Sequence, residues 1–252
     1  MDEPTTMKST EKLFLIVEEL RERNGARVTE LANDLDIPKS TVHRHLKTLQ
    51  DLEYVMKSGD IYHVGAKFLH VGSAVRNREE AYVRIKPKIK KLATETEERA
   101  QFMIEEHGYM VYVHREIGAQ AVRTNTQLGK QMPMHATSGG KAILAEMPDE
   151  TVSRIIERHE LSEITENTIT SEEALYDELQ QIRDEGVSYN DQEYIDGLRG
   201  ISVPILRPNG QVLGAIGLSG PSHRLKGDLY REELPNKLLG VANEVELNMK
   251  YS

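Results

Sequence analysis

The sequence predicts an α+β protein with a mostly helical amino-terminal domain and a carboxy-terminal domain that mixes strands with helices. Two patterns support this. Before position 52, apolar residues recur every three or four positions, and two short alternating segments follow. Beyond position 100, strand patterns alternate with helix patterns. The 252 residues are enough for two domains, each with its own core.

The segment after Ile37 predicts a helix with two different faces. Pro38 suits the first position of a helix, where its missing N–H is not needed, and we expect the helix to run to about position 52. Val42, Leu46 and Leu49 share one face, which predicts that this face packs in a core. The opposite face carries Ser40, His43, Arg44 and Lys47.

Two further helices complete the predicted amino-terminal bundle. Ser9 or Thr10 can cap a first helix that ends near Asn24-Gly25. Thr29 can cap a short second helix, and Asp36-Ile37 then forms a tight turn into the third. In such a helix-turn-helix, the second helix of the motif enters the major groove of DNA.

Segments 54–57 and 61–64 predict a hairpin around Ser58-Gly59-Asp60. The hairpin makes the unit a winged helix-turn-helix, in which the tip of the wing can reach phosphate or the minor groove. On the outer face of the third helix, His43 and Arg44 are the expected base readers. The residues expected to contact DNA are Lys39, Ser40, Thr41, His43, Arg44, Lys47, Lys57 and Ser58.

The net charge of −9 by itself argues against a nucleic-acid partner. The local charge is different, because segment 38–50 contains no Asp or Glu while three basic residues and two histidines lie there. The chain contains no Cys, which excludes disulfides, zinc–thiolate sites and cysteine nucleophiles. No apolar run is long enough to span a bilayer and the amino terminus is polar, so we expect a soluble, cytoplasmic protein without a membrane partner.

The pattern from 66 to about 98 is helical, and we place the linker between the domains there, with Pro87 kinking a helix or beginning a new one. Strands are predicted at 101–105 and 110–115, as a hairpin around His107-Gly108, and then at 121–124, 187–190, 201–206 and 212–219. Helices are predicted from 138, from 148 to 159, from a capping box at 170–173 to Gly186, and at the end of the chain. The expected boundaries are 1–72 for the winged helix-turn-helix domain, 73–98 for the linker helices and 99–252 for the carboxy-terminal domain.

Short segments spread along the chain stand in a specific order and spacing. They are Leu31-Ala32 with 37–44, the segments 62–65 and 69–72, MHATSGGKA at 134–142, 186–193, GLRGISVPI at 197–205 and IGLSGP at 216–221. In these segments the chain resembles the IclR family of transcriptional regulators over nearly its full length. The resemblance implies a winged helix-turn-helix and an effector-binding domain with a GAF- or PAS-like antiparallel sheet flanked by helices. It also implies a homodimer or homotetramer on double-stranded operator DNA.

The resemblance further implies a small-molecule pocket. Asn190 stands where some members have an acid, and Gly217 where some have a serine. A Gly-rich turn leading into a helix at 138–141 presents backbone N–H groups that, with the helix dipole, favour a carboxylate. Asn190 and Ser219 can add neutral hydrogen bonds, so we expect a small organic or sugar acid as effector. The pocket positions implied by the family are Ser138, Gly139, Asn190, Gly200, Gly217 and Ser219.

Enzyme motifs are incomplete in this chain. A P-loop at Gly140-Lys141 would need a glycine at His135 and a hydroxyl residue at Ala142, and a nucleophile elbow fails at Pro221. The histidines show no paired metal-ligand spacing, and we expect no cofactor, no metal and no catalytic residue. Our first hypothesis is therefore a ligand-responsive regulator whose dimer binds a pseudo-palindromic operator.

Two alternatives stay open. The first is a small-molecule enzyme, or a metabolite-binding protein, whose amino-terminal helices only dimerise. The second is a non-specific architectural DNA binder, which the net charge disfavours.

Overall fold

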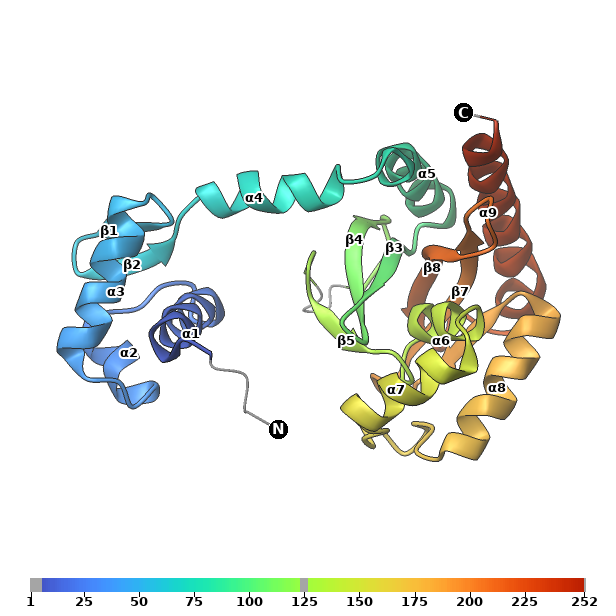
Figure 1. The fold of residues 1–252 in the computed structure, drawn as a ribbon. Helices are drawn as coiled ribbons and strands as arrows, with labels where there is room; N and C mark the ends of the chain where they lie inside the picture. Colours follow the sequence, from blue (N-terminus) through green and yellow to red (C-terminus); the bar gives the residue numbers. More distant parts are fainter. Residues whose placement is uncertain (1–5, 123–126, 252) are drawn as a thin grey trace. The chain divides into compact units, whose positions relative to one another are not determined.

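The computed structural model of the protein describes residues 6–122 and 127–251, which form two compact units that divide between Val75 and Arg76 (Figure 1). The first unit holds helices and a two-stranded sheet, and the second holds a six-stranded sheet with helices on both faces. This confirms the predicted α+β class. Within the described ranges, no helix is both long and apolar enough to cross a membrane.

The first unit is a winged helix-turn-helix. Helices α1 (Lys8–Glu22), α2 (Val28–Asp34) and α3 (Lys39–Asp51) precede strands β1 (Val55–Ser58) and β2 (Ile61–Val64). The strands pair antiparallel with Ser58 opposite Ile61, so Gly59-Asp60 forms the turn of the wing. The core of the unit contains Ile16, Leu20, Leu31, Val42, Leu46, Leu49 and Tyr62.

Three helix starts in this unit differ from the predictions. Helix α1 begins after Met7, Thr29 lies inside the first turn of α2, and Pro38 precedes α3 in an extended conformation. At α2, the carboxylate of Glu30 accepts a hydrogen bond of 2.6 Å from the backbone N–H of Arg27. A glutamate within the first turn therefore marks this start, instead of the predicted threonine cap.

The segment predicted as linker, 73–98, is divided between two helices. Helix α4 (Lys67–Arg76) buries none of its residues, whereas α5 (Glu80–Thr96) buries Ile85, Ile89 and Leu92 in the core of the second unit. Pro87 lies within α5 and does not end it. Both Pro87 and Val83 are exposed, so water can satisfy the carbonyl group of Val83 that a proline leaves without a partner.

The sheet of the second unit is antiparallel throughout, in the order β5-β4-β3-β8-β7-β6. The predicted hairpin at His107-Gly108 is confirmed, and both residues have the positive φ (59° and 82°) that suits a type I′ turn. The strand expected at 121–124 lies partly outside the described residues, and β5 pairs with β4 instead. The strands are β3 (Arg99–Glu106), β4 (Tyr109–Ile117), β5 (Gln131–Pro133), β6 (Ser188–Asp191), β7 (Leu198–Leu206) and β8 (Val212–Pro221).

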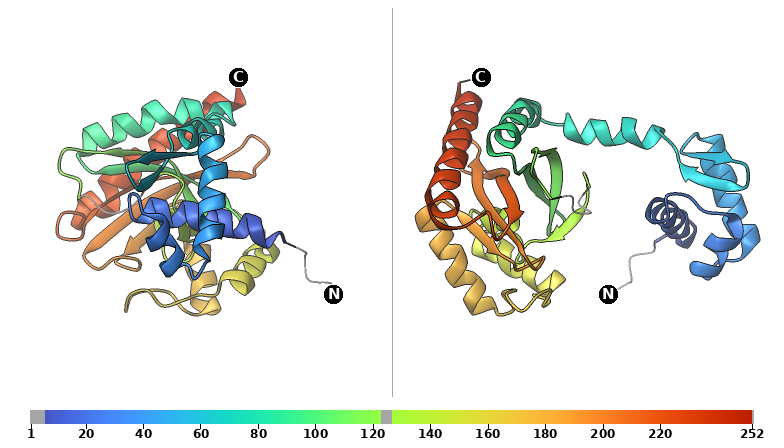
Figure 2. Two further views of the ribbon diagram at one scale, coloured as in Figure 1. Left: turned by 90° about the vertical axis from the view of Figure 1, so that its left-hand side faces the viewer. Right: turned by 180° about the vertical axis from the view of Figure 1, so that it is seen from behind.

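Helices cover both faces of this sheet (Figure 2). Helices α5 and α9 (Leu234–Lys250), the latter preceded by the π-helical turn η1 (Leu229–Glu233), pack on one face. Helices α6 (Ser138–Ala145), α7 (Asp149–His159) and α8 (Glu172–Glu185) pack on the other. Helix α8 ends at Gly186 as predicted, but its cap is Ser171, whose Oγ accepts a hydrogen bond from the backbone N–H of Ala174.

Strand β3 shows how the two faces differ. Its residues alternate, with Ala100, Phe102 and Ile104 in the apolar core beneath α5 and α9. Arg99, Gln101 and Met103 face the side that carries α6. The second face is therefore only partly apolar, and its polar end is where a site can form.

Candidate functional site

The outer face of α3 is exposed. Val42 and Leu46 have no exposed surface and point into the first unit, so the residues between them point outward. Arg44 has no ion-pair partner in the part of the chain that the structure describes, whereas Lys47 is bound to Asp51 at 2.6 Å. Of the residues predicted to contact DNA, Lys39, Ser40, His43, Arg44, Lys47, Lys57 and Ser58 are exposed and Thr41 is half-buried.

The charge state of His45 and the position of Lys57 affect the charge on this surface. Partial burial lowers the pKa of His45, and the nearby cations Arg44 and Lys12 lower it further, so this imidazole is neutral at neutral pH. The Nζ atom of Lys57 lies 5.1 Å from the centre of the Tyr62 ring, which places the wing lysine over its own sheet.

Helix α1 extends the basic surface beyond the predicted residues. Lys8 and Lys12 of α1 line a groove together with Arg44, His45 and Thr48 of α3. Sequence reasoning missed these lysines, because only the packing of α1 beside α3 brings them to the outer face. Their spacing of four residues, which places both lysines on one side of the predicted first helix, was the available signal.

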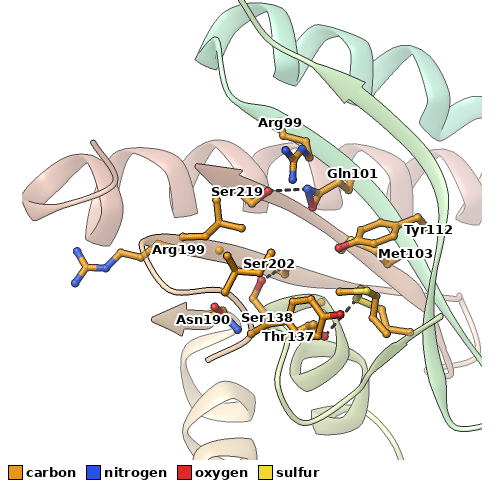
Figure 3. Close-up of a pocket in the computed structure, with 17 residues that line it drawn as sticks. Arg99, Gln101, Met103, Tyr112, Thr137, Ser138, Asn190, Arg199, Ser202 and Ser219 are labelled. Atoms are coloured by element: carbon orange, nitrogen blue, oxygen red, sulfur yellow. Dashed lines mark hydrogen bonds between the residues drawn. The ribbon is translucent and has the colours of Figure 1, made fainter. Parts of the chain in front are cut away.

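A cavity lies between the polar part of the sheet and the start of α6 (Figure 3). It encloses about 510 Å³ of empty space, including its open mouth. Gly217 is not among the residues that line it. A Cβ atom at this position would lie 2.3 Å from Ser202 Oγ, so this glycine lets β7 and β8 approach closely. The other predicted pocket residues line the cavity: Ser138, Gly139, Asn190, Gly200 and Ser219.

The first turn of α6 forms one end of the cavity. The Oγ1 atom of Thr137 accepts a hydrogen bond of 3.1 Å from the backbone N–H of Gly140 and caps the helix. A Cβ atom on Gly140 would lie 2.2 Å from the Met134 carbonyl oxygen, so only glycine allows this close approach. Ser138 Oγ lies 2.9 Å from Ser202 Oγ, which joins the helix start to β7.

Two polar side chains from β3 face the other end of the cavity, and sequence reasoning missed both. Gln101 Nε2 donates to Ser219 Oγ at 2.8 Å, and Arg99 lies opposite Ser219 in the β3–β8 register. Arg99 is only 3% exposed; burial lowers its pKa to about 10, with a smaller effect from Arg115, so its guanidinium stays charged at neutral pH. The alternation of polar and apolar residues at 99–104 was the signal for this pair.

The remaining wall is largely apolar. Met103, Met110, Met132 and Tyr112 line it, and burial raises the pKa of Tyr112 to about 12, so its phenol is neutral. The guanidinium of Arg199 points away from the cavity, as Figure 3 shows, and is bound to Asp191.

Asn190 contributes an acceptor to the cavity. Its Nδ2 atom donates to the Ala136 carbonyl oxygen at 2.6 Å, and its carboxamide oxygen can accept a hydrogen bond from a ligand.

Lys141 holds the cavity in shape from behind α6. It is 1% exposed, and its Nζ atom lies 2.8 Å from Glu178 of α8 and 2.9 Å from Glu193. Glu193 precedes Tyr194 and Ile195, which line the cavity, so the ion pair fixes this loop against α6. The Lys141 ammonium is fully committed to protein carboxylates and is not available to cradle a phosphate, as a P-loop lysine would.

Three histidines of this unit have structural contacts. The rings of His114, His135 and His159 each lie within hydrogen-bond distance of a backbone carbonyl oxygen. Among the described residues, no group of three His, Asp or Glu side chains could hold a metal ion.

The two sites together define a class of protein. A winged helix-turn-helix with a basic outer helix is a DNA-binding module, and a separate domain with a cavity lined by polar and apolar side chains is typical of a sensor. A family model described as the helix-turn-helix domain of IclR matches residues 9–59, and one described as the bacterial transcriptional regulator IclR C-terminal domain matches residues 74–247. The chain belongs to the IclR family of ligand-responsive transcriptional regulators.

Individual relatives agree with this assignment. ArcR of Halobacterium salinarum, named a probable HTH-type transcriptional regulator, is 30% identical over 252 residues, which cover 98% of this chain and 96% of the relative. The crystal structure of IclR from Thermotoga maritima is 25% identical with a TM-score of 0.80, covering 96% of this chain and 97% of that one. An IclR homologue from Microbacterium hydrocarbonoxydans, crystallised with 4-hydroxybenzoate, shares the fold with a TM-score of 0.77 at 21% identity, covering 95% of this chain and 100% of that one.

Replacing Lys141 with Met should destabilise the second unit by about 3–5 kcal/mol near neutral pH, because it leaves a buried carboxylate without its partner. Burial raises the pKa of Glu193 above the ordinary value, so the native state binds more protons than the unfolded state and stability falls as pH rises through this range. Loss of the lysine raises this pKa further. Urea unfolding should therefore show a smaller deficit at about pH 5 than at about pH 7.5.

Lys237→Met is the matched control, because Lys237 pairs with Glu95 at the surface, and its stability should stay close to that of the wild type at both pH values. The double variant Lys141→Met/Glu193→Gln should recover part of the loss. An equal deficit at both pH values would contradict the assigned role of Glu193.

Proposed function

We propose that this chain is a regulator that binds a pseudo-palindromic operator as a dimer, through the outer face of α3, and that a small organic or sugar acid in the cavity changes its operator affinity. The observation that supports this most strongly is the exposed face of α3, with Arg44 unpaired in the described structure and a basic groove beside it. A cation without a protein partner is free to bind guanine edges or phosphate.

The composition of the cavity supports a binding role over catalysis. The described residues that line it include no Asp, Glu, His or Lys, so no carboxylate, imidazole or amine of these residues faces a ligand as a general acid or base. The two nearest carboxylates on the loop, Asp191 and Glu193, are bound to Arg199 and Lys141. Saturable binding of small acids without turnover would agree with a sensor, and turnover by the intact protein would favour the enzyme alternative.

An acid is the proposed effector because a buried guanidinium and the start of α6 both face the cavity. The structure of the Microbacterium relative contains a carboxylate ligand, 4-hydroxybenzoate, which agrees in chemical class. The acid can change operator binding only if it binds the DNA-competent and DNA-incompetent arrangements with different affinities.

Helix α4 supplies the argument for a dimer. Leu69, Val71 and Val75 are 77%, 47% and 42% exposed, with Val71 and Val75 on one side of the helix and Leu69 on another. Phe68 packs partly against the core of the first unit, but a helix that fully buries none of its residues and exposes three large apolar side chains is suited to pack against a second copy.

Replacing Arg44 with Ala should weaken binding to an operator selected by the wild-type protein from random-sequence duplexes. The expected cost is about 1–3 kcal/mol, concentrated at one base position, because a base-reading arginine is lost. Fluorescence anisotropy at fixed salt measures the cost, and a repeat of the selection with the variant should show relaxed specificity at that position.

Arg21→Ala is the control, since Arg21 is an exposed arginine of α1 that already pairs with Glu18 and Glu22. This variant should bind the operator as the wild type does. Unchanged binding by Arg44→Ala, or an equal loss in both variants, would refute the assignment of Arg44.

Replacing Leu69 with Glu should shift the protein toward the monomer in sedimentation velocity experiments and lower operator affinity in parallel, because a charge would be buried at the proposed contact. His70→Glu is the control, because His70 is an exposed polar residue next to Leu69 in the same helix, so a charge at this position removes no apolar surface. A dimer that forms equally well in both variants would place the contact elsewhere.

A further inference from the structure

The cavity has polar groups at two ends and an apolar wall between them (Figure 3). Arg99, Gln101 and Ser219 form one end, on the strands of the sheet. Ser138 and Asn190 belong to the other, at the start of α6. Tyr112 and the methionines lie along the side. The two ends differ in charge, and this difference indicates which way round a ligand binds.

The first end holds a buried cation without a carboxylate partner in the described part of the chain. Arg99 is only 3% exposed, and its Nε atom has no hydrogen-bond partner among the described residues. Its guanidinium donates a hydrogen bond to the carbonyl oxygen of Val122. No carboxylate of the described residues pairs with it, and the neighbouring acid, Glu98, is bound to Arg224 through both oxygens.

Such a cation is costly in the ligand-free protein, because a buried charge needs an opposite charge or water to compensate its lost hydration. The guanidinium of Arg115, opposite Gln101 on β4, adds to the positive potential and helps to lower the pKa of Arg99. An anion bound at this end would remove the cost, and this makes it the strongest carboxylate position in the cavity.

The second end offers only neutral groups and a helix start. Ser138 Oγ is hydrogen-bonded to Ser202 Oγ, and Thr137 Oγ1 already accepts a hydrogen bond from the backbone N–H of Gly140. The amino end of a helix is equivalent to about half a positive charge, less than the full charge of a guanidinium. A ligand with a single carboxylate therefore gains more by placing it at Arg99, which differs from the position at the helix start that the sequence predicted.

We propose that Arg99, supported by Gln101 and Ser219, binds the carboxylate of the effector, and that Ser138 and Asn190 receive a hydroxyl or carbonyl group at its far end. The effector class is then a small acid in which an apolar or aromatic segment separates the carboxylate from a neutral polar group. This inference rests on the proposed effector-binding function and gives it a direction and a specificity residue.

The test uses the full chain with matched probes: hydroxybenzoates, oxo acids and hydroxy acids, each beside its primary amide. Thermal shift selects the compounds that bind, and calorimetry gives their affinities. The wild type should bind one or more acids and not the corresponding amides. Arg99→Met should weaken the bound acids roughly 10- to 100-fold, because a charge-assisted hydrogen bond is lost.

Two further variants separate a binding role from a structural one. Ser138→Ala should weaken hydroxyl-bearing acids about 3- to 10-fold and leave acids without the hydroxyl unchanged, as expected for one neutral hydrogen bond. Arg154→Gln, on the exposed surface of α7, should change nothing. Without ligand, Arg99→Met should melt at the same temperature as the wild type or above it, because an unpaired buried charge has been removed.

Each outcome decides a different point. Equal binding of acids and amides, or unchanged acid affinity in Arg99→Met, would overturn the inference while leaving the regulator proposal in place. A large drop in the melting temperature of ligand-free Arg99→Met would make Arg99 a structural residue bound to Val122 and would also overturn it. If no compound bound the wild type while operator binding persisted, the proposed effector function itself would fail.

Discussion

The need to compensate buried positive charge organises the second unit. Two cations lie on the same side of its sheet, and the protein treats them differently. Lys141 is held by Glu178 and Glu193, and this cluster joins α6, α8 and the loop that borders the cavity. Within residues 6–122 and 127–251, Arg99 hydrogen-bonds the carbonyl oxygen of Val122 and its Nε atom has no partner. The first arrangement gives a fixed scaffold, and the second leaves a charge for a ligand to compensate.

The alternation of strand residues makes this division compatible with a stable fold. Because β3 sends Phe102 and Ile104 into the core and Arg99 and Gln101 into the cavity, the same strand supplies both packing and recognition. Helices α5 and α9 cover the apolar face. On the other face, Gly140 has no side chain, so α6 can lie close to the backbone at Met134. This position lets Ser138 contact Ser202 of β7.

Most of the fold could be predicted from the sequence because its signals are local. The apolar stripe of α3, the turn at His107-Gly108 and the end of α8 at Gly186 each depend on a few neighbouring residues. Helix starts were predicted less well. At α2 the decisive contact is the hydrogen bond from the backbone N–H of Arg27 to the carboxylate of Glu30. The neighbouring Thr29 is also a residue type that caps helices, so the sequence alone does not show which of the two marks the start.

The candidate site could be predicted only in part, for a related reason. Ser138, Asn190 and Ser219 stand in motifs, whereas Arg99 becomes a cavity residue only when β8 pairs with β3 and α6 packs over that face. Gly217 shows the reverse case, since its motif suggested a ligand contact and the strand pairing gives it a packing role. Contacts between segments far apart in the sequence decide such positions.

The central claim is that the cavity and the DNA-binding face are coupled in one molecule. The most direct measurement is the affinity of a bound acid for the wild-type protein, determined by calorimetry with the protein free and with it saturated by operator. Linkage requires the two acid affinities to differ by the same factor by which the acid changes operator affinity, and this is the result we predict. Identical acid affinities in the two states, for an acid that binds the cavity, would contradict the account.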